Sequence, residues 1–240
     1  MSINQITKKT TLLTGGTRGI GSIIKQVLLE RGDEVYTASR SQSSDPNHFS
    51  INLPDQIEIN KTLKLNYLVF THRYRGNDWD DDFNITVKGV DQIINVFKNL
   101  FLDEASIVIL GSNAGRFVLE EQSASYHATR AALEGLMRYY AVTLGKKGIR
   151  CNCVLPASVI KPENEKFFTK DNNVRNMLEE ITPLQRMGAA KEIADVVEFL
   201  CSSKSSYLTG QTLYVDGGIS ARGQESIARE IGSLQHPNAK

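Results

Sequence analysis

The sequence predicts an α/β protein whose parallel sheet is doubly wound, with helices on both faces. Two observations lead to this fold class. Short apolar runs alternate with longer segments of helical periodicity, which is typical of parallel strands joined by crossover helices. A glycine-rich segment, residues 14–21, lies between the first strand-like run and the first helical one. With 240 residues and 40% hydrophobic content, the chain is long enough for one large core, so we expect a single domain over residues 1–240.

In the N-terminal half, each expected element has its own signal. The apolar run 11–13 is the first strand, and apolar residues at helical spacing over 20–28 form the first helix, which ends at Gly32. A helix over 79–97 begins with acidic side chains, which complement the positive end of the helix dipole, and continues with apolar ones at helical spacing. Apolar or β-branched runs predict three further strands, over 34–38, 49–52 and 67–70.

The C-terminal half continues the alternation. A strand over 106–110 leads into a loop and a long helix over 123–145, and the nearly all-apolar run 150–155 is the next strand. A polar insert over about 161–188 follows the carboxyl end of that strand, where a substrate lid would lie. The remaining elements are an amphipathic helix over 192–200, a last strand over 212–215 and a polar tail over 219–240. We expect this tail to pack last or to stay mobile.

The segment 14–21 has the composition of a dinucleotide site. Glycines let the backbone turn tightly and approach a pyrophosphate, and free N–H groups at the start of the next helix face the anion. Arg40 ends the second strand, where an acidic residue would bind the ribose 2′-hydroxyl of NAD, whereas an arginine suits a 2′-phosphate. Together with Arg18 in the turn, it predicts NADP(H) as the cofactor. The alternatives are an ordinary glycine-rich turn and two solvated surface arginines.

Composition argues against several classes of protein. The net charge is +1, so we expect no nucleic-acid partner and no membrane partner. No apolar run approaches the roughly 20 residues that span a bilayer, and residues 1–9 lack the apolar core of a signal peptide. These features predict a cytoplasmic protein. We expect Cys151 and Cys153 on opposite faces of one strand as reduced, buried thiols, and the acidic run over 78–82 as a solvated helix start, so no metal site is predicted.

Taken in order, these features resemble the classical short-chain dehydrogenases/reductases over nearly the whole chain. The resemblance implies a Rossmann-type domain, a homotetramer or homodimer, and a nicotinamide cofactor that acts on alcohols and carbonyls. The residues that carry it are Thr14-Gly15 with Gly19 and Gly21, Ser112, Tyr126, the strand 150–156, Pro183-Leu184 with Arg186 and Gly188, Glu192-Ile193-Ala194, Leu200, Thr209-Gly210 and Asp216-Gly217-Gly218.

The resemblance also implies roles for single residues. Tyr126 takes the place of the family's acid/base tyrosine, whose pKa near 10 must be lowered by a neighbouring cation. Ser112, fourteen positions earlier, holds the substrate oxygen. Arg130, on the same helix face as Tyr126, stands where the family has lysine, and Thr86 stands where it has asparagine. The implied cofactor contacts are Gly15, Thr17, Arg18, Gly19, Ile20, Gly21, Ser39, Arg40, Asn52, Leu53, Phe70, Pro156 and Val159.

Four departures from the family pattern affect the chemistry. Arg130 keeps a permanent positive charge but does not release a proton, so a proton relay through this side chain is lost. Phe70 and His72 bring bulk to the segment where the family has Asn-Asn-Ala-Gly. Thr86 retains only the main-chain carbonyl of the family's asparagine. Lys161 replaces a threonine that usually holds the nicotinamide carboxamide, and it would suit a cofactor phosphate or an acidic substrate.

Two functions from different classes remain open. The first is an NADP-dependent oxidoreductase for a carbonyl or alcohol of a small polar metabolite. We expect an anionic or carbohydrate-like substrate, because the cluster 73–75 and Lys161 would line the mouth of the cleft. The alternative is a catalytically weak or inactive dinucleotide-binding scaffold or sensor, which Arg130 favours; a dehydratase or epimerase on the same fold is a third. His72 is either a substitute acid/base or, as we favour, a surface or cofactor-wall histidine.

Overall fold

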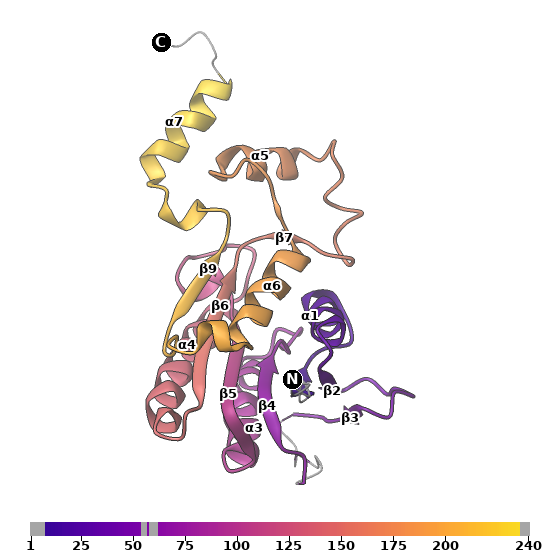
Figure 1. Ribbon diagram of the computed structural model, residues 1–240. Coiled ribbons are helices and arrows are strands. Elements are labelled where there is room, and N and C mark those ends of the chain that lie inside the picture. Colours follow the sequence, from indigo (N-terminus) through magenta and orange to yellow (C-terminus); the bar gives the residue numbers. More distant parts are fainter. Residues whose placement is uncertain (1–7, 54–56, 58–61, 236–240) are drawn as a thin grey trace, which may run out of the picture.

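The computed structural model describes residues 8–53, 57 and 62–235, and its centre is one parallel sheet. Seven strands follow the order β3-β2-β1-β4-β5-β6-β9 (Figure 1). The order reverses between β1 and β4, which opens a crevice at the carboxyl ends of these strands. The strands are β1 (Thr10–Thr14), β2 (Glu34–Ser39), β3 (His48–Ser50), β4 (Leu65–Phe70), β5 (Phe101–Leu110), β6 (Arg150–Pro156) and β9 (Thr212–Val215).

Helices cover both faces of the sheet, which confirms the predicted fold class. Alternate strand residues point to opposite faces, so Leu12 packs in the layer under α3 and α4, and Leu13 in the layer under α1 and α6. In the described part of the chain, no helix combines the length and the apolar character needed to cross a membrane. The helices are α1 (Gly19–Glu30), α2 (Trp79–Asp82), a π-helical segment (Phe83–Lys88), α3 (Gly89–Phe97), α4 (Ala124–Gly145), α5 (Asn173–Ile181), α6 (Ala190–Leu200) and α7 (Gln224–Gln235).

The two cysteines of β6 share one face of the sheet. Cys151 and Cys153 both lie in the layer under α3 and α4, so the expectation of opposite faces was wrong. Residues two apart in a strand point to the same side. Burial raises the pKa of both thiols, that of Cys153 to about 12. Burial also raises the pKa of Cys201, in the other layer, to about 12. All three cysteines are free and buried, as the sequence predicts.

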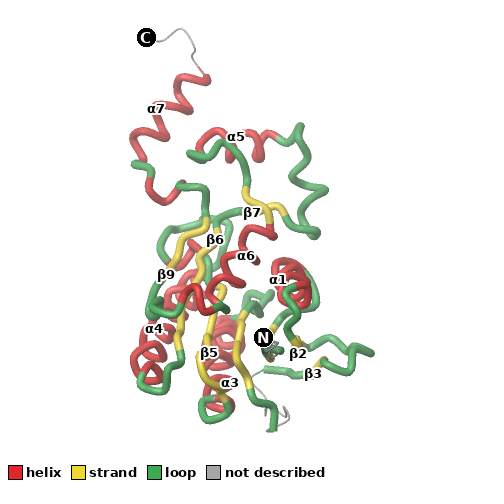
Figure 2. The backbone as a smooth tube through the Cα atoms, in the orientation of Figure 1, coloured by secondary structure: helices red, strands yellow, loops and turns green. Residues whose placement is uncertain are grey.

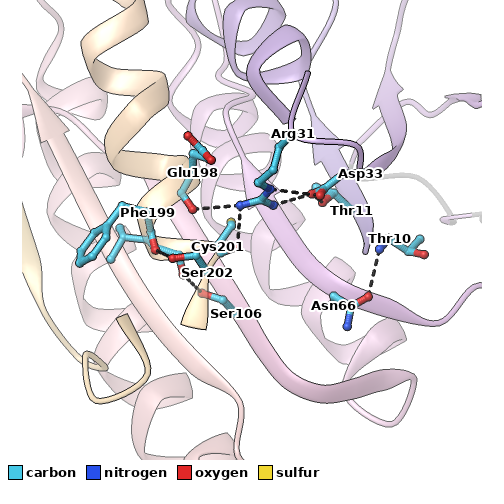
Figure 3. A network of polar contacts seen from close by, with 11 residues as sticks. Thr10, Thr11, Arg31, Asp33, Asn66, Ser106, Glu198, Phe199, Cys201 and Ser202 are labelled. Atoms are coloured by element: carbon cyan, nitrogen blue, oxygen red, sulfur yellow. Dashed lines mark hydrogen bonds and ion pairs between the residues drawn. The ribbon is translucent and has the colours of Figure 1, made fainter. Parts of the chain in front are cut away.

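A polar network joins the C-terminal ends of α1 and α6 at the edge of the sheet where the strands begin (Figure 3). The Arg31 guanidinium donates to the main-chain carbonyls of Glu198 and Cys201, at 3.1 and 2.8 Å. It also forms a two-bond ion pair with Asp33, at 3.1 and 2.5 Å. The Thr11 hydroxyl donates to the same carboxylate at 3.1 Å. The network therefore fixes these helices at the end opposite to the crevice.

Two segments extend beyond the carboxyl ends of the strands (Figures 1 and 2). The first follows β6 and contains the short strand β7 (Val159–Ile160), α5 and the strand β8 (Gly188–Ala189), which pairs with β7. The second follows β9 and contains α7, a helix that the polar composition of the tail does not predict. Arg222 ties the two together by donating to the carbonyl of Ile181 at 2.8 Å. The last five residues of the predicted tail, 236–240, and residues 1–7 lie outside the described residues.

Candidate active site

A cavity of about 340 Å³ lies at the carboxyl ends of the strands. Its lining comes from the turn after β1, the ends of β2 and β4, the segment after β5, the start of α4 and the segment after β6. This is the crevice that the strand order creates beside β1 and β4. Residues that are far apart in sequence therefore line the same cavity, for example Gly15, Ser112 and Lys161.

The glycine turn lies at one end of the cavity, with its backbone packed too closely for side chains. Gly15 has φ of +78°, and a Cβ there would lie 2.8 Å from the main-chain nitrogen of His72. A Cβ at Gly21 would lie 2.5 Å from the Gly15 carbonyl oxygen. α1 begins at Gly19, and no side chain caps its first N–H groups. The turn is therefore free to offer backbone donors to an anion.

Positive charge is in excess around the cavity. Six cationic side chains line it, against the carboxylates of Glu121 and Glu163. In the described part of the chain, none of the six forms an ion pair. Burial and then the charge of Arg73 lower the pKa of both Arg75 and Lys161. A polyanion would relieve this repulsion. The six cations are Arg18, Arg40, Arg73, Arg75, Arg130 and Lys161.

Glu163 lies against the glycine turn. A Cβ at Gly19 would be 2.8 Å from Glu163 Oε1, so this carboxylate from the segment after β6 touches the start of α1. No sequence motif links the insert to the glycine turn, so the position of Glu163 was not predictable. A carboxylate of the insert therefore lies beside the glycine turn.

Tyr126 and Ser112 both line the inner part of the cavity. Ser123 caps α4 by accepting a hydrogen bond from the Tyr126 main-chain nitrogen at 3.1 Å, which places Tyr126 in the first turn. Ser112 directly follows β5. Arg116, four residues later, forms a two-bond ion pair with the buried Glu134 of α4, at 2.8 and 2.5 Å. This ion pair holds the Ser112 segment against α4 and so keeps both hydroxyls at one wall.

The surroundings of Tyr126 favour its ionised form. Burial raises the pKa of Tyr126, but the charge of Arg130, hydrogen bonding from Ser112 and the charge and hydrogen bonding of Arg73 outweigh it, and the net pKa is below the usual value. The Arg130 guanidinium carbon lies 4.6 Å from the centre of the Tyr126 ring. A phenol with a lowered pKa, beside a serine hydroxyl, is an arrangement for proton exchange with a substrate oxygen.

Known proteins resemble this chain over most of its length. The family model described as Enoyl-(Acyl carrier protein) reductase matches residues 69–220. The chain is 31% identical to the 3-oxoacyl-[acyl-carrier-protein] reductase of Staphylococcus aureus, over 88% of this chain and 98% of that protein. It is also 31% identical to a tropinone reductase homolog of Arabidopsis thaliana, over 90% and 93%. The crystal structure of a short chain dehydrogenase family protein from Francisella tularensis superposes with a TM-score of 0.77, at 26% identity, over 90% of this chain and all of that chain.

The chain belongs to the short-chain dehydrogenase/reductase family. The curated relatives match along nearly their whole length, and the chain is an oxidoreductase of this family. The resemblance inferred from the sequence motifs is thereby confirmed at the level of the family. The roles of single residues in this family member rest on the geometry of its own cavity.

Arg130 is the least expected member of the site. Only 2% of its surface is exposed, and burial lowers its pKa. Among the described residues, nothing accepts a hydrogen bond from its Nε or Nη2. Buried donors without partners are costly, and these two belong to a side chain that lines the cavity. Acceptors on a bound molecule, such as ribose hydroxyls, would satisfy them, so the residues present fit a dinucleotide cofactor.

Beneath Arg130, Asp82 is a buried carboxylate, so its interpretation as part of a solvated helix start was wrong. It accepts hydrogen bonds from the hydroxyls of Thr86 at 2.9 Å, Ser125 at 3.1 Å and Thr129 at 3.4 Å. Its charge partly offsets the lowering of the pKa of Arg130 that burial causes. The acidic run hides this role because Asp82 is the one of its four aspartates that points inward.

His72 is held in one neutral form. Its Nε2 lies 3.0 Å from the carbonyl oxygen of Ile85, which only accepts, so Nε2 carries the proton. Its Nδ1 then accepts from the Thr14 hydroxyl at 2.7 Å. Burial lowers the pKa of His72 to about 4. Because both ring nitrogens are occupied by protein groups, the geometry favours a cofactor-wall histidine over a substitute acid/base.

The pKa of His72 predicts an acid-sensitive contribution to stability. A histidine whose pKa falls from about 6.5 unfolded to about 4 folded stabilises the protein fully above pH 6.5. That contribution, on the order of 3 kcal/mol, is lost as the pH falls toward 4. Urea unfolding of the wild type and His72→Asn between pH 7.5 and 4.5 checks this. The difference in unfolding free energy between them should shrink toward acid; a constant difference would contradict the assignment.

Most predicted cofactor residues line the cavity, and three predicted site residues lie off its wall. Phe70 is buried in the core, and the Thr86 hydroxyl is bound to Asp82. Asn52 is exposed, and its neighbours Ile51 and Leu53 line the cavity instead. The alternation of apolar and polar residues over 51–53 indicates which side chains point inward, and the prediction did not use it. The predicted residues that do line it are Gly15, Thr17, Arg18, Gly19, Ile20, Gly21, Ser39, Arg40, Leu53, Ser112, Tyr126, Arg130, Pro156 and Val159.

Proposed function

We propose that this family member is an NADP-dependent oxidoreductase that transfers hydride between nicotinamide and a carbonyl or alcohol of a small polar metabolite. The observation that carries the proposal is the placement of Tyr126, Ser112 and a buried cation, Arg130, in one cavity with the glycine turn. The two hydroxyls are the groups that would contact the reacting oxygen. The excess of cations around them fits a polyanionic cofactor.

In the mechanism we propose, the chain supplies placement, charge and a proton. The glycine turn would hold the pyrophosphate, Arg18 and Arg40 would hold the 2′-phosphate, and Arg130 would hold ribose hydroxyls. When bound, the nicotinamide supplies or accepts the hydride. In reduction Tyr126 donates its phenolic proton to the substrate oxygen, and Ser112 donates a hydrogen bond to the same oxygen. Arg130 stabilises the tyrosinate that remains, and solvent returns the proton, because a guanidinium does not release one.

The choice of NADP over NAD rests on two exposed arginines at the same end of the cavity. Arg18 lies in the glycine turn and Arg40 directly follows β2, beside Ser39 and Ser41, which also line the cavity. An arginine fork matches the oxygens of a 2′-phosphate, and the serines add hydroxyl donors. This grouping supports the proposed cofactor.

Replacing both arginines by glutamine should therefore weaken NADPH binding selectively. Hydrogen bonds to a charged group contribute about 1.5–3 kcal/mol each, so we expect the Kd for NADPH to rise by about 10²-fold or more. NADH lacks the 2′-phosphate, and its Kd should change by less than about threefold. Fluorescence titration of Arg18→Gln/Arg40→Gln with both cofactors measures this, with Arg138→Gln in α4, outside the cavity, as control. An equal loss for both cofactors would argue against a 2′-phosphate site.

The insert after β6 supports the proposal of a substrate lid over about 161–188. Lys161, Asn164 and Phe168 line the cavity, and α5 lies beyond it. A homo-oligomer, tetramer or dimer, is also part of the proposal, supported by the exposed side chains of Tyr139 and Val142 on α4. Size-exclusion chromatography with light scattering measures the subunit count.

A second candidate function is a weak or inactive dinucleotide-binding scaffold or sensor. Arg130 favours it, because an arginine gives no proton relay beside Tyr126. The two functions separate in one assay: NADPH oxidation with a panel of aldehydes, ketones and oxo acids, at enzyme concentrations high enough to detect slow turnover. Tight NADPH binding without turnover of any compound would support the scaffold.

A further inference from the structure

A second cavity, of about 360 Å³, adjoins the first at Tyr126. Its walls are the segment after β4, including Arg73 to Asn77, and the segment before α4, including Glu121 to Ser123. Tyr126 and Arg73 line both cavities. Tyr126, the proton donor of the proposed mechanism, therefore also lines a cavity whose walls do not include the glycine turn. Polar and charged side chains dominate this cavity.

Arg73 is an exposed cation at the junction of the two cavities. Its charge acts on Tyr126, Arg75 and Lys161. No carboxylate in the described residues forms an ion pair with it. Its guanidinium has five N–H donors, which can bind a carboxylate.

We infer that Arg73 binds the carboxylate of the substrate, and that the substrate is a 2-oxo or 3-oxo acid or the corresponding hydroxy acid. This inference rests on the proposed function. Because Arg73 and Tyr126 line the same two cavities, an anion that Arg73 holds lies near the oxygen that Tyr126 would protonate. A carboxylate one or two carbon–carbon bonds from the carbonyl carbon meets this condition, and a guanidinium fork binds it with two hydrogen bonds.

The other side chains of the second cavity narrow the class further. Polar groups line it beside Arg73, among them Asn77, Gln122 and Ser123. The inferred substrate is therefore an oxo acid with a polar or small remainder. In its reduction the carbonyl carbon gains a hydride and the oxygen gains the Tyr126 proton, so the oxo acid becomes a hydroxy acid as NADPH is oxidised to NADP⁺.

Matched pairs of substrates test this inference in the full chain. NADPH oxidation is measured with pyruvate against pyruvamide and acetoacetate against acetoacetamide, for the wild type, Arg73→Gln, Arg73→Lys and the control Arg138→Gln. We expect the wild type to prefer one acid over its amide by about 10- to 100-fold in kcat/KM, mainly through KM. Arg73→Gln should remove that preference, Arg73→Lys should retain part of it, and the control should leave it unchanged.

A binding measurement keeps this inference separate from the proposed function. Oxamate, an unreactive analogue of pyruvate, is titrated calorimetrically into the NADP⁺-saturated protein, and Arg73→Gln should weaken its binding at least tenfold. Equal rates with acids and amides, or equal losses for both in Arg73→Gln, would overturn the role of Arg73. If no carbonyl compound is reduced, the proposed function fails. The binding experiment still tests the carboxylate site in that case. Loss of oxamate binding in Arg73→Gln supports the site, and unchanged binding rejects it.

Discussion

Replacing Tyr126 by phenylalanine should lower kcat by about 10²- to 10⁴-fold, the range that a positioned general acid contributes. The ring remains, so its contact with Arg130, whose guanidinium carbon lies 4.6 Å from the ring centre, is retained and the fold should not change. The Kd for NADPH should stay within about threefold of the wild type. Steady-state kinetics and fluorescence titration of Tyr126→Phe measure the two quantities.

The pH dependence supplies the control for this experiment. Since the charges of Arg130 and Arg73 and hydrogen bonding from Ser112 outweigh burial and lower the pKa of Tyr126, its proton is lost at a lower pH than from a free tyrosine. Reduction needs the protonated phenol, so its rate should fall as pH rises through that pKa, and oxidation should show the opposite trend. Any residual rate of Tyr126→Phe should lack this titration. A Tyr126→Phe rate within about tenfold of the wild type would show that another group donates the proton.

Replacing Arg130 by methionine should lower activity without lowering the stability of the cofactor-free protein. The change removes the cation that stabilises ionised Tyr126, and removal of one preorganised donor of this kind costs about 10²- to 10³-fold in kcat. NADPH binding should also weaken, because the inferred partners of Nε and Nη2 lose their donors. Without cofactor, however, the free energy of unfolding should not fall, since these two buried donors are unpartnered among the described residues.

The energies of the contacts around Arg130 explain why the free energy of unfolding should not fall. An unsatisfied buried donor costs about 1–3 kcal/mol, whereas the cation–ring contact with Tyr126 contributes about 0.5–2 kcal/mol. Asp82 keeps its three hydroxyl donors when Arg130 is removed. Urea unfolding of the cofactor-free protein measures the outcome, and a fall of more than about 1 kcal/mol would contradict it. Arg130→Lys is the companion variant: a large gain in rate would mark the wild type as a weak catalyst, and a loss would mark the arginine as adapted to this site.

Local sequence patterns were sufficient for the sheet and for many of the residues that line the cavity. The strand–glycine–helix order around Gly15 depends on backbone conformation. Glycine residues in the sequence directly indicate where such a conformation is needed. Tyr126 and Arg130 are four apart in one helix, so their contact follows from helix geometry. Arg18 and Arg40 line the cavity, as the sequence predicts, because each belongs to an element whose end must meet the crevice.

Contacts between distant segments were not predictable in the same way. The burial of Asp82 depends on hydroxyls from α4, more than forty residues later, and an acidic run alone indicates a solvated helix start. Glu163 reaches Gly19 only because the insert after β6 folds over the glycine turn. Helical periodicity over 79–97 does not reveal that the middle of this helix has π-helical geometry, because apolar spacing is compatible with both. The helix α7 escaped detection because its sequence is polar.

The rates at which the buried cysteines react with thiol reagents would measure transient opening of the two layers that cover the sheet. Only a thiolate reacts with disulfide reagents, and Cys153 and Cys201 have pKa values of about 12 in the folded state. Each lies in a different layer, one under α3 and α4 and the other under α1 and α6. Labelling of the native protein therefore reports how often each side of the sheet opens. Comparing the two labelling rates with and without cofactor would show which layer the dinucleotide holds closed.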